Sequence, residues 1–257
     1  MRDFTLNIYR DLLLAARASG YEFSTVVGWL GGTRPEHTLI LRHDVDRLPG
    51  RALRMAQIEA ENGVAATYYF RNKPHVLKRE IVRAISNLGH EIGYHYEVLS
   101  DANGDIDRAR ALFNQSLETL RSICPIQTAT MHGRPLSKYD NRLIWDHMRP
   151  EEFGLTGEGY LAFAGARIVY LTDTGRTWGA GQNVRDRVTG AESAPVRHTS
   201  DVIEALRSKA YPTVYLSAHP ERWTDGLLSW TASSMLDAGV NFMKFAFIQA
   251  RRIKGQV

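Results

Sequence analysis

The stretch LRHDVD at residues 41–46 overlaps the apolar run TLIL at 38–41 and places two carboxylates, Asp44 and Asp46, directly after a predicted strand. Acidic side chains at such a position have no packing role. Because residues two apart on an extended chain point the same way, both carboxylates can face one cation or share one proton, as a metal ligand and a general base. A solvated turn before the following LPG would also account for them.

Strand-like and helical segments alternate on both sides of this stretch. Strand-like runs occupy 66–70, 90–94, 127–131, 167–171 and 213–216, and helical patterns occupy 51–62, 78–88, the segment from about 105 to 120, 139–147, 201–209 and 225–237, followed by an apolar segment at 240–249. Repeated strand–helix units without a break in composition predict one α/β domain, a closed or nearly closed parallel barrel. In such barrels the catalytic side chains lie where strands end.

Composition sets the class of protein but names no partner. The chain has 257 residues, of which 44% are hydrophobic and 23% charged, so it can bury a sizeable core. Its net charge of +4 is small and scattered, which does not favour nucleic acid as a partner. The single cysteine, Cys124, excludes an internal disulfide framework. No signal peptide or apolar run of membrane-spanning length is evident, so we expect a cytoplasmic protein without stable membrane insertion.

Three further predicted strands end in histidine. His95 lies within GHEIGYHYE, His132 within MHGRP and His219 within VYLSAHP. Imidazole and carboxylate groups together are the ligands of zinc-class metals, and Glu97 stands two residues beyond His95. His90, in the same segment, is expected to be a structural residue. The repeated placement of histidine at strand ends is what favours a site over ordinary core histidines.

These motifs resemble, in order and spacing, those of the polysaccharide deacetylases of carbohydrate esterase family four, which share the NodB homology domain. LRHDVD, GHEIGYH, GRP, DTGRTW at 173–178 and LSAHP correspond to the family's five motifs, and the resemblance spans residues 39–220. It implies a distorted (β/α) barrel of about seven strands over 1–257, with 1–37 as an N-terminal helix and lead-in. HDVD as the first motif marks a divergent branch.

The resemblance also implies catalytic roles. Asp44 corresponds to the family's catalytic base and His219 to its general acid. Arg134 and Asp173 correspond to the pair that orients the base, and Trp178 corresponds to an aromatic wall of the substrate site. The implied reaction is metal-dependent hydrolysis of an N-acyl group, above all N-acetyl, from a sugar.

The implied metal site departs from the family pattern. Asp46 and His95 correspond to two ligands of one divalent ion, expected to be zinc, with cobalt, nickel or manganese as alternatives. The second ligand histidine, four residues after His95, is Leu99 here, and the two acids of the first motif are separated by one residue instead of being adjacent. His132 is the first choice for the missing ligand, and Glu97 is the second.

Aromatic and basic residues beside the motifs are candidate substrate contacts. Trp178, Trp223 and Tyr139 can stack on a sugar face, and Arg176 can meet a phosphate or carboxylate. The long polar segment at 179–195 is expected to be a substrate-side loop, and it carries two further arginines, Arg185 and Arg187.

The aromatic and basic candidate contacts favour one class of substrate. This is a nucleotide-linked or lipid-linked precursor of a surface polysaccharide, such as O-antigen or lipopolysaccharide, and not an assembled polymer. Two alternatives stay open. A deformylase, or an amidase acting on an amidated uronic acid, would use the same metal and water. A metal-free carbohydrate-binding relative would retain the fold without the chemistry, and Val45 and Leu99 keep this reading open.

Overall fold

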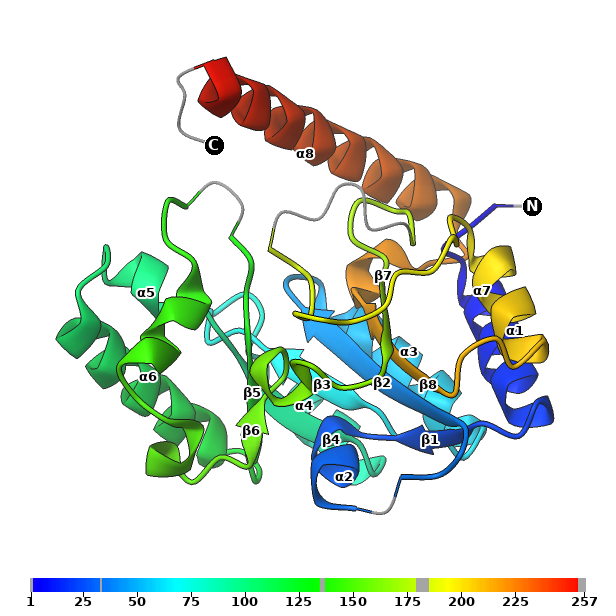
Figure 1. The fold of residues 1–257 in the computed structure, drawn as a ribbon, viewed down its shortest axis with the longest axis horizontal. Coiled ribbons are helices and arrows are strands. Elements are labelled where there is room, and N and C mark those ends of the chain that lie inside the picture. The colour runs from blue at the N-terminus through cyan, green and yellow to red at the C-terminus, as the bar shows by residue number, and fades with distance from the viewer. Residues whose placement is uncertain (1, 33, 135–136, 179–184, 254–257) are drawn as a thin grey trace.

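The computed structural model describes residues 2–32, 34–134, 137–178 and 185–253, which form one parallel sheet surrounded by helices (Figure 1). The strands are β1 Glu22–Ser24, β2 Thr38–Val45, β3 Thr67–Phe70, β4 Glu91–Tyr96, β5 Thr128–Met131, β6 Gly157–Glu158, β7 Val169–Thr172 and β8 Thr213–Ala218. They pair in the order β6-β5-β4-β3-β2-β8-β7, and β1 pairs with β2. Within the described residues the end strands β6 and β7 do not pair with each other, so the barrel is open between them.

The path through seven parallel strands confirms the predicted α/β barrel class. β2 lies at its centre, between β3 and β8, and all eight of its residues are buried. It is longer than the apolar run at 38–41 indicated, because Arg42, His43 and Asp44 also pair with neighbouring strands. Asp44 therefore lies inside the strand, and Asp46 is the first residue beyond it.

Helices pack around the outside of the curled sheet, with α5 and α6 at one end and α1 and α7 at the other (Figure 1). Their bounds are α1 Leu6–Ala18, α2 Val26–Gly31, α3 Pro49–Glu61, α4 Arg79–Asn87, α5 Val98–Asp101, α6 Ile106–Arg121, α7 Thr199–Arg207 and α8 Leu227–Ile253. α6 shows how the sequence builds them. Asp105 caps its first turn by accepting the N–H of Arg108, and Ala109, Phe113 and Leu117 form the buried face at helical spacing.

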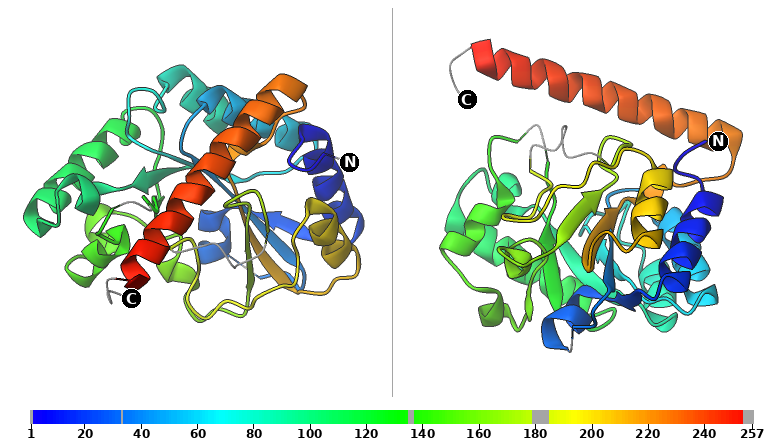
Figure 2. Two further views of the ribbon diagram at one scale, coloured as in Figure 1. Left: turned by 90° about the horizontal axis from the view of Figure 1, so that it is seen from above. Right: turned by 45° about the vertical axis from the view of Figure 1, so that its right-hand side comes forward.

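The second half of the chain differs from the predicted elements in two places. The segment at 139–147 contains a 3₁₀ helix, Asn141–Asp146, that begins at the capping side chain of Asp140. The predicted helix at 225–237 and the apolar segment at 240–249 are one helix, α8. In the view from above, α8 crosses the rest of the molecule diagonally (Figure 2). None of the helices described is both long and apolar enough to span a membrane.

The barrel interior is tightly packed at Gly93 in β4, and this generates a test of the packing. A Cβ atom there would overlap the ring of Tyr69 on β3. We expect Gly93→Ala to lower the free energy of unfolding by about 1–3 kcal/mol, as overpacked core substitutions do. Gly50→Ala, on the exposed first turn of α3 where a Cβ meets no atom within 4 Å, is the matched control and is expected to leave stability unchanged or slightly higher. Urea unfolding of both variants measures the difference, and equal stabilities would contradict this packing.

Candidate metal centre

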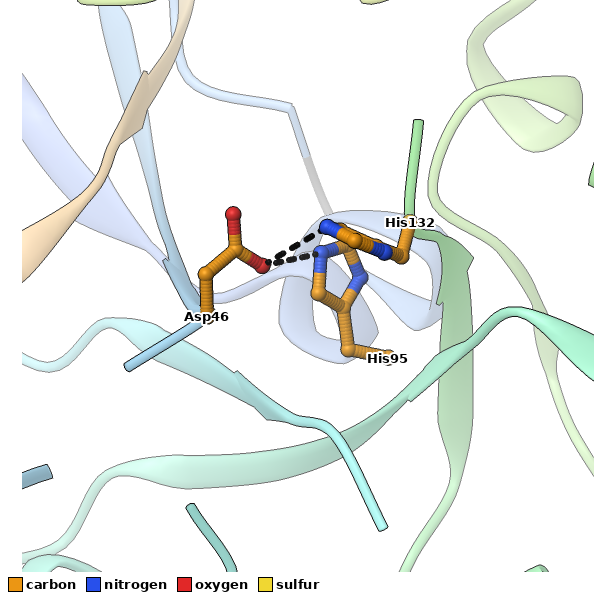
Figure 3. A group of neighbouring side chains, drawn as sticks. All are labelled: Asp46, His95 and His132. Carbon is orange, nitrogen blue, oxygen red and sulfur yellow. Dashed lines mark ion pairs between the residues drawn. The ribbon is translucent and has the colours of Figure 1, made fainter. Parts of the chain in front are cut away.

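Three side chains that could hold a metal meet at the carboxyl edge of the sheet (Figure 3). Asp46 follows β2, His95 lies near the end of β4, and His132 follows β5 and continues its ladder by donating its N–H to the carbonyl of Tyr96. The Oδ1 atom of Asp46 lies 3.2 Å from Nε2 of His95 and 3.5 Å from Nε2 of His132. Parallel strands all end at the same edge, which is why residues so distant in the sequence converge.

Hydrogen bonds at the far side of each imidazole fix which nitrogen faces the site. Nδ1 of His95 donates to the carbonyl of Thr130 at 3.1 Å, and Nδ1 of His132 donates to the Glu97 carboxylate at 3.1 Å. In the neutral rings both Nε2 atoms therefore present lone pairs. They face Asp46 Oδ1, a buried atom that makes no hydrogen bond within the described residues. Three electron-pair donors around one point fit a divalent cation of the zinc class.

Glu97, the alternative ligand, is engaged elsewhere. One of its oxygens accepts from Arg71 at 2.7 Å and lies 3.2 Å from Nζ of Lys73, while the other accepts from His132. Burial raises the pKa of Glu97, but the hydrogen bond to His132 and the charge of Arg71 hold that pKa well below its usual range. The geometry makes Glu97 the carboxylate partner of His132, a position that orients a ligand histidine and raises its basicity. Leu99, at the family's ligand position, is buried in α5.

Asp44 lies beside these ligands and is held by Arg42, not by Arg134. Arg42 donates from Nε at 2.8 Å and from Nη2 at 2.7 Å to the two oxygens of Asp44, and Asp44 Oδ2 lies 3.8 Å from Nε2 of His95. Burial raises the pKa of Asp44, but the charge of Arg42, its hydrogen bonds and the nearby charges of His95 and His219 together outweigh burial and lower the pKa. Arg134 pairs instead with Asp101, which corrects its expected role. The sequence signal was present, because Arg42 and Asp44 are two apart on one strand.

Asp173 likewise has a different partner from the one expected, because it contacts His219, the candidate acid. Nδ1 of His219 lies 2.6 Å from Asp173 Oδ1, and Asp173 also accepts from Arg222 at 2.7 Å and from the indole of Trp223 at 2.8 Å. Burial and the Arg222 charge lower the pKa of His219, but the charge and hydrogen bond of Asp173, together with the charge of Asp46, raise the pKa to about 9. His219 is therefore protonated at neutral pH, and Nδ1 is the ring nitrogen that Asp173 binds.

The expected aromatic wall belongs to the core. Trp178 is 2% exposed, stacks on Phe4 and donates its indole N–H to Thr199, and Trp223 is 1% exposed. Little of either ring is exposed, but Trp178 lines a cavity together with Thr172 and Asp186, so its contact with a substrate stays a prediction. The pattern alone could not separate a stacking tryptophan from a buried one. Trp223 acquires a different role, as a donor to Asp173.

Two further candidate substrate contacts, Arg176 and Tyr139, make contacts within the protein. Arg176 donates to the carbonyl of Arg222 and lies 3.5 Å from Asp237 of α8, so its charge is paired inside the protein. Tyr139 is half-buried, with its ring against Gly104 at the start of α6, and its contact with a substrate stays a prediction.

Sequence reasoning missed the half-buried acid Asp186 in the expected substrate-side loop. Residues 179–184 of that loop lie outside the described residues, whereas 185–195 run along β7, where Glu192 bridges to Val169. Asp186 accepts four side-chain hydrogen bonds. The signal for it was an acid between two arginines in an otherwise polar loop, and nothing in the sequence showed that four side chains donate to it.

Comparisons with known proteins find similarity in structure only. No family model and no curated protein matches the sequence. Among solved structures, a CE4 family pseudoenzyme from Bacillus anthracis matches with a TM-score of 0.45 at 13% identity, over 83% of this chain and 63% of that chain. Its mutant with restored enzymatic activity gives 0.46 at 13% identity, over 83% and 65%. A family 4 carbohydrate esterase from Bacillus anthracis gives 0.42 at 15% identity, over 80% and 88%. The chain thus spans just under two thirds of the pseudoenzyme's length.

The geometry predicts how metal binding responds to substitution. We expect about one equivalent of zinc in the reconstituted protein, and its loss in both His95→Ala and His132→Ala, because each removes a donor atom. Glu97→Gln should retain the ion with about 10–100-fold weaker affinity, since it alters only the partner of His132. Elemental mass spectrometry and competition with a chelator measure both effects. His147→Ala, at an exposed histidine, is the control. Retention of full affinity in His132→Ala, with loss in Glu97→Gln, would transfer the ligand role to Glu97.

Proposed function

We propose that this protein is a metal-dependent hydrolase that removes an N-acyl group, above all N-acetyl, from a sugar. One observation carries the proposal. Asp44, held ionised by Arg42, and His219, held protonated by Asp173, share the carboxyl edge of the sheet with the three candidate ligands. Two titratable groups whose environments push their pKa values in opposite directions are the usual mark of a base and an acid.

The residues divide the work of amide hydrolysis. A metal ion at Asp46, His95 and His132 would lower the pKa of a water molecule and polarise the acyl carbonyl. Asp44 accepts the proton of the attacking water, and the two hydrogen bonds from Arg42 keep this carboxylate ionised and fixed in direction. An amine departs poorly as an anion, so the leaving nitrogen needs a proton. His219 donates it from Nε2, because Asp173 binds Nδ1.

The sugar part of the proposal rests on the order of the five sequence motifs. A nucleotide-linked or lipid-linked N-acetyl sugar, used in surface polysaccharide synthesis in the cytoplasm, is the substrate we propose. Formyl and carboxamide groups could enter the same chemistry, and the group that leaves identifies the reaction. Acetate indicates a deacetylase, formate a deformylase and ammonia an amidase.

The metal-loaded protein is expected to release acetate from nucleotide-linked N-acetyl sugars faster than from chitooligosaccharides. Asp44→Asn and His219→Gln should each lower kcat by about 10²–10⁴-fold, because each removes one proton-transfer step. Asp44→Asn should still bind metal, which separates loss of the base from loss of the site. Acetate, formate and ammonia are assayed together. A metal-loaded protein that binds sugar but releases none of the three would contradict the proposal and support the inactive relative.

The raised pKa of His219 predicts how the activity depends on pH. His219 works only while protonated, and its pKa is raised to about 9, so kcat/KM should hold through neutral pH and fall as the pH rises through about 9. Asp44 has a lowered pKa, so it stays ionised over that range. In Asp173→Asn the alkaline fall should move to lower pH, because the carboxylate that raises the pKa of His219 is gone. An alkaline fall that stays in place in Asp173→Asn would show that another group is the acid.

A further inference from the structure

A single loop carboxylate, that of Asp186, reaches into the open side of the barrel between β6 and β7. Its Oδ1 accepts from the hydroxyls of Tyr160 at 2.9 Å and Tyr170 at 2.5 Å. Its Oδ2 accepts from Thr172 at 2.7 Å and Thr174 at 2.5 Å. Four donors to one carboxylate are more than a loop needs to be held in position. One of the four, Tyr160, also contacts Arg42, which binds the candidate base.

That donor is Tyr160, which touches both Asp186 and Arg42. Arg42 donates from Nη2 to the Tyr160 hydroxyl oxygen at 2.8 Å, and the same nitrogen donates to Asp44 at 2.7 Å. A guanidinium only donates and an ionised carboxylate only accepts, so the single proton of Tyr160 points to Asp186. The hydrogen bonds therefore run in one direction, from Arg42 through Tyr160 to Asp186, while Arg42 also holds Asp44.

Asp186 is ionised in this setting. Burial raises its pKa, but the charges of His219 and Arg42, together with the hydrogen bonds from Thr174 and Tyr170, lower the pKa to about 2. Arg42 has no exposed surface, and its guanidinium carbon lies 4.3 Å from the centre of the Tyr160 ring. Water cannot replace a lost partner at such a site, so the direction of the guanidinium depends on the side chains that accept from it.

Arg185, the residue before Asp186, connects the same loop to the segment that follows the candidate ligand His132. Arg185 donates from Nη1 to the carbonyls of Gly133 and Arg134, each at 3.0 Å, and from Nη2 to the carbonyl of Ser137 at 2.7 Å. These carbonyls belong to the loop that begins at His132, one of the three candidate ligands. Asp186 thus holds the loop near Arg42 and the candidate base, and Arg185 holds it near the candidate ligand His132.

We propose that Asp186 is a positioning residue for the base Asp44, acting through Tyr160 and Arg42. Its four bonds hold the Tyr160 hydroxyl in place, and that hydroxyl fixes the guanidinium that directs both oxygens of Asp44. The catalytic part of this inference rests on the proposed hydrolysis, whereas the positioning of Arg42 does not.

Two tyrosines give a matched test. Tyr160 and Tyr170 both donate to Oδ1 of Asp186, but only Tyr160 also accepts a hydrogen bond from Arg42. In the metal-free protein, nitrogen-15 NMR follows the Nε–H of Arg42, assigned through an Arg42→Lys variant or through selective arginine labelling. We expect its exchange with water to become about tenfold faster in Tyr160→Phe and in Asp186→Asn, as loss of one hydrogen bond allows. Tyr170→Phe should change the exchange far less, because Tyr160, Thr172 and Thr174 still donate to Asp186.

Kinetics of the metal-loaded protein supply the second arm. Asp186→Asn and Tyr160→Phe should each lower kcat by about 10–100-fold with KM nearly unchanged, because a misdirected base slows the reaction without altering binding. The double variant should fall no further than the slower single variant, since both substitutions interrupt one line of contacts. Metal content should remain that of the unaltered protein in all three.

The two arms separate failure of this inference from failure of the proposed function. Equal exchange of the Arg42 Nε–H in Tyr160→Phe and Tyr170→Phe would overturn the positioning role, whatever the activity. Effects on kcat that multiply in the double variant would also overturn it, because independent structural damage behaves in that way. Faster exchange in a protein that releases no acyl product would support the positioning role and contradict only the hydrolysis.

Discussion

The arrangement of the site depends on a buried ion pair between two residues of one strand. Arg42 and Asp44 face the barrel interior from β2 and share two hydrogen bonds, with side chains that are 0% and 3% exposed. Removing both charges from water is costly, and the pair is stable only where further partners satisfy the guanidinium. The hydroxyls of Tyr160 and Tyr215 supply them. The pair is therefore stable only where the surrounding strands enclose it. It also holds the ionised Asp44 carboxylate beside the candidate ligand histidines.

The opposite face of β2 is also polar and buried. Nε2 of His43 lies 2.6 Å from the carboxylate of Glu59 on α3, and that carboxylate also accepts from Tyr9 and from Tyr68. Burial raises the pKa of Glu59, but the charge and hydrogen bond of His43, with the charge of His90 and the hydrogen bond from Tyr9, together lower this pKa. The central strand is thus anchored to the helix layer on one side while its other side carries the candidate base. Two buried charged clusters, back to back on one strand, restrict how β2 can shift.

These clusters explain which parts of the molecule the sequence could predict. The alternation of apolar strands and helices sufficed for the barrel, and strand-end placement sufficed to bring Asp46, His95 and His132 to one edge. The strand itself was predicted to end near residue 41, because Arg, His and Asp in a row have the composition of a loop. Only the counter-charges that tertiary structure supplies allow those residues to be buried.

The contacts that the sequence did not predict join distant segments. From Arg42, which holds the candidate base Asp44, the line of hydrogen bonds continues to Tyr160 and then to Asp186 in two other parts of the chain. The hydrophobic periodicity of the sequence does not indicate hydrogen bonds between such distant segments. Nor did the sequence show that Trp178, an aromatic residue beside a motif, is 2% exposed and stacks on Phe4.

The central claim is that one metal ion is held by two imidazoles and a carboxylate at the end of β2, β4 and β5. X-ray absorption at the zinc edge of the loaded protein tests it most directly. The account predicts nitrogen and oxygen donors at about 2.0–2.2 Å with the outer-ring scattering of two imidazoles, and loss of one imidazole contribution in His132→Ala. A spectrum without imidazole scattering, or one that His132→Ala leaves unchanged, would contradict it.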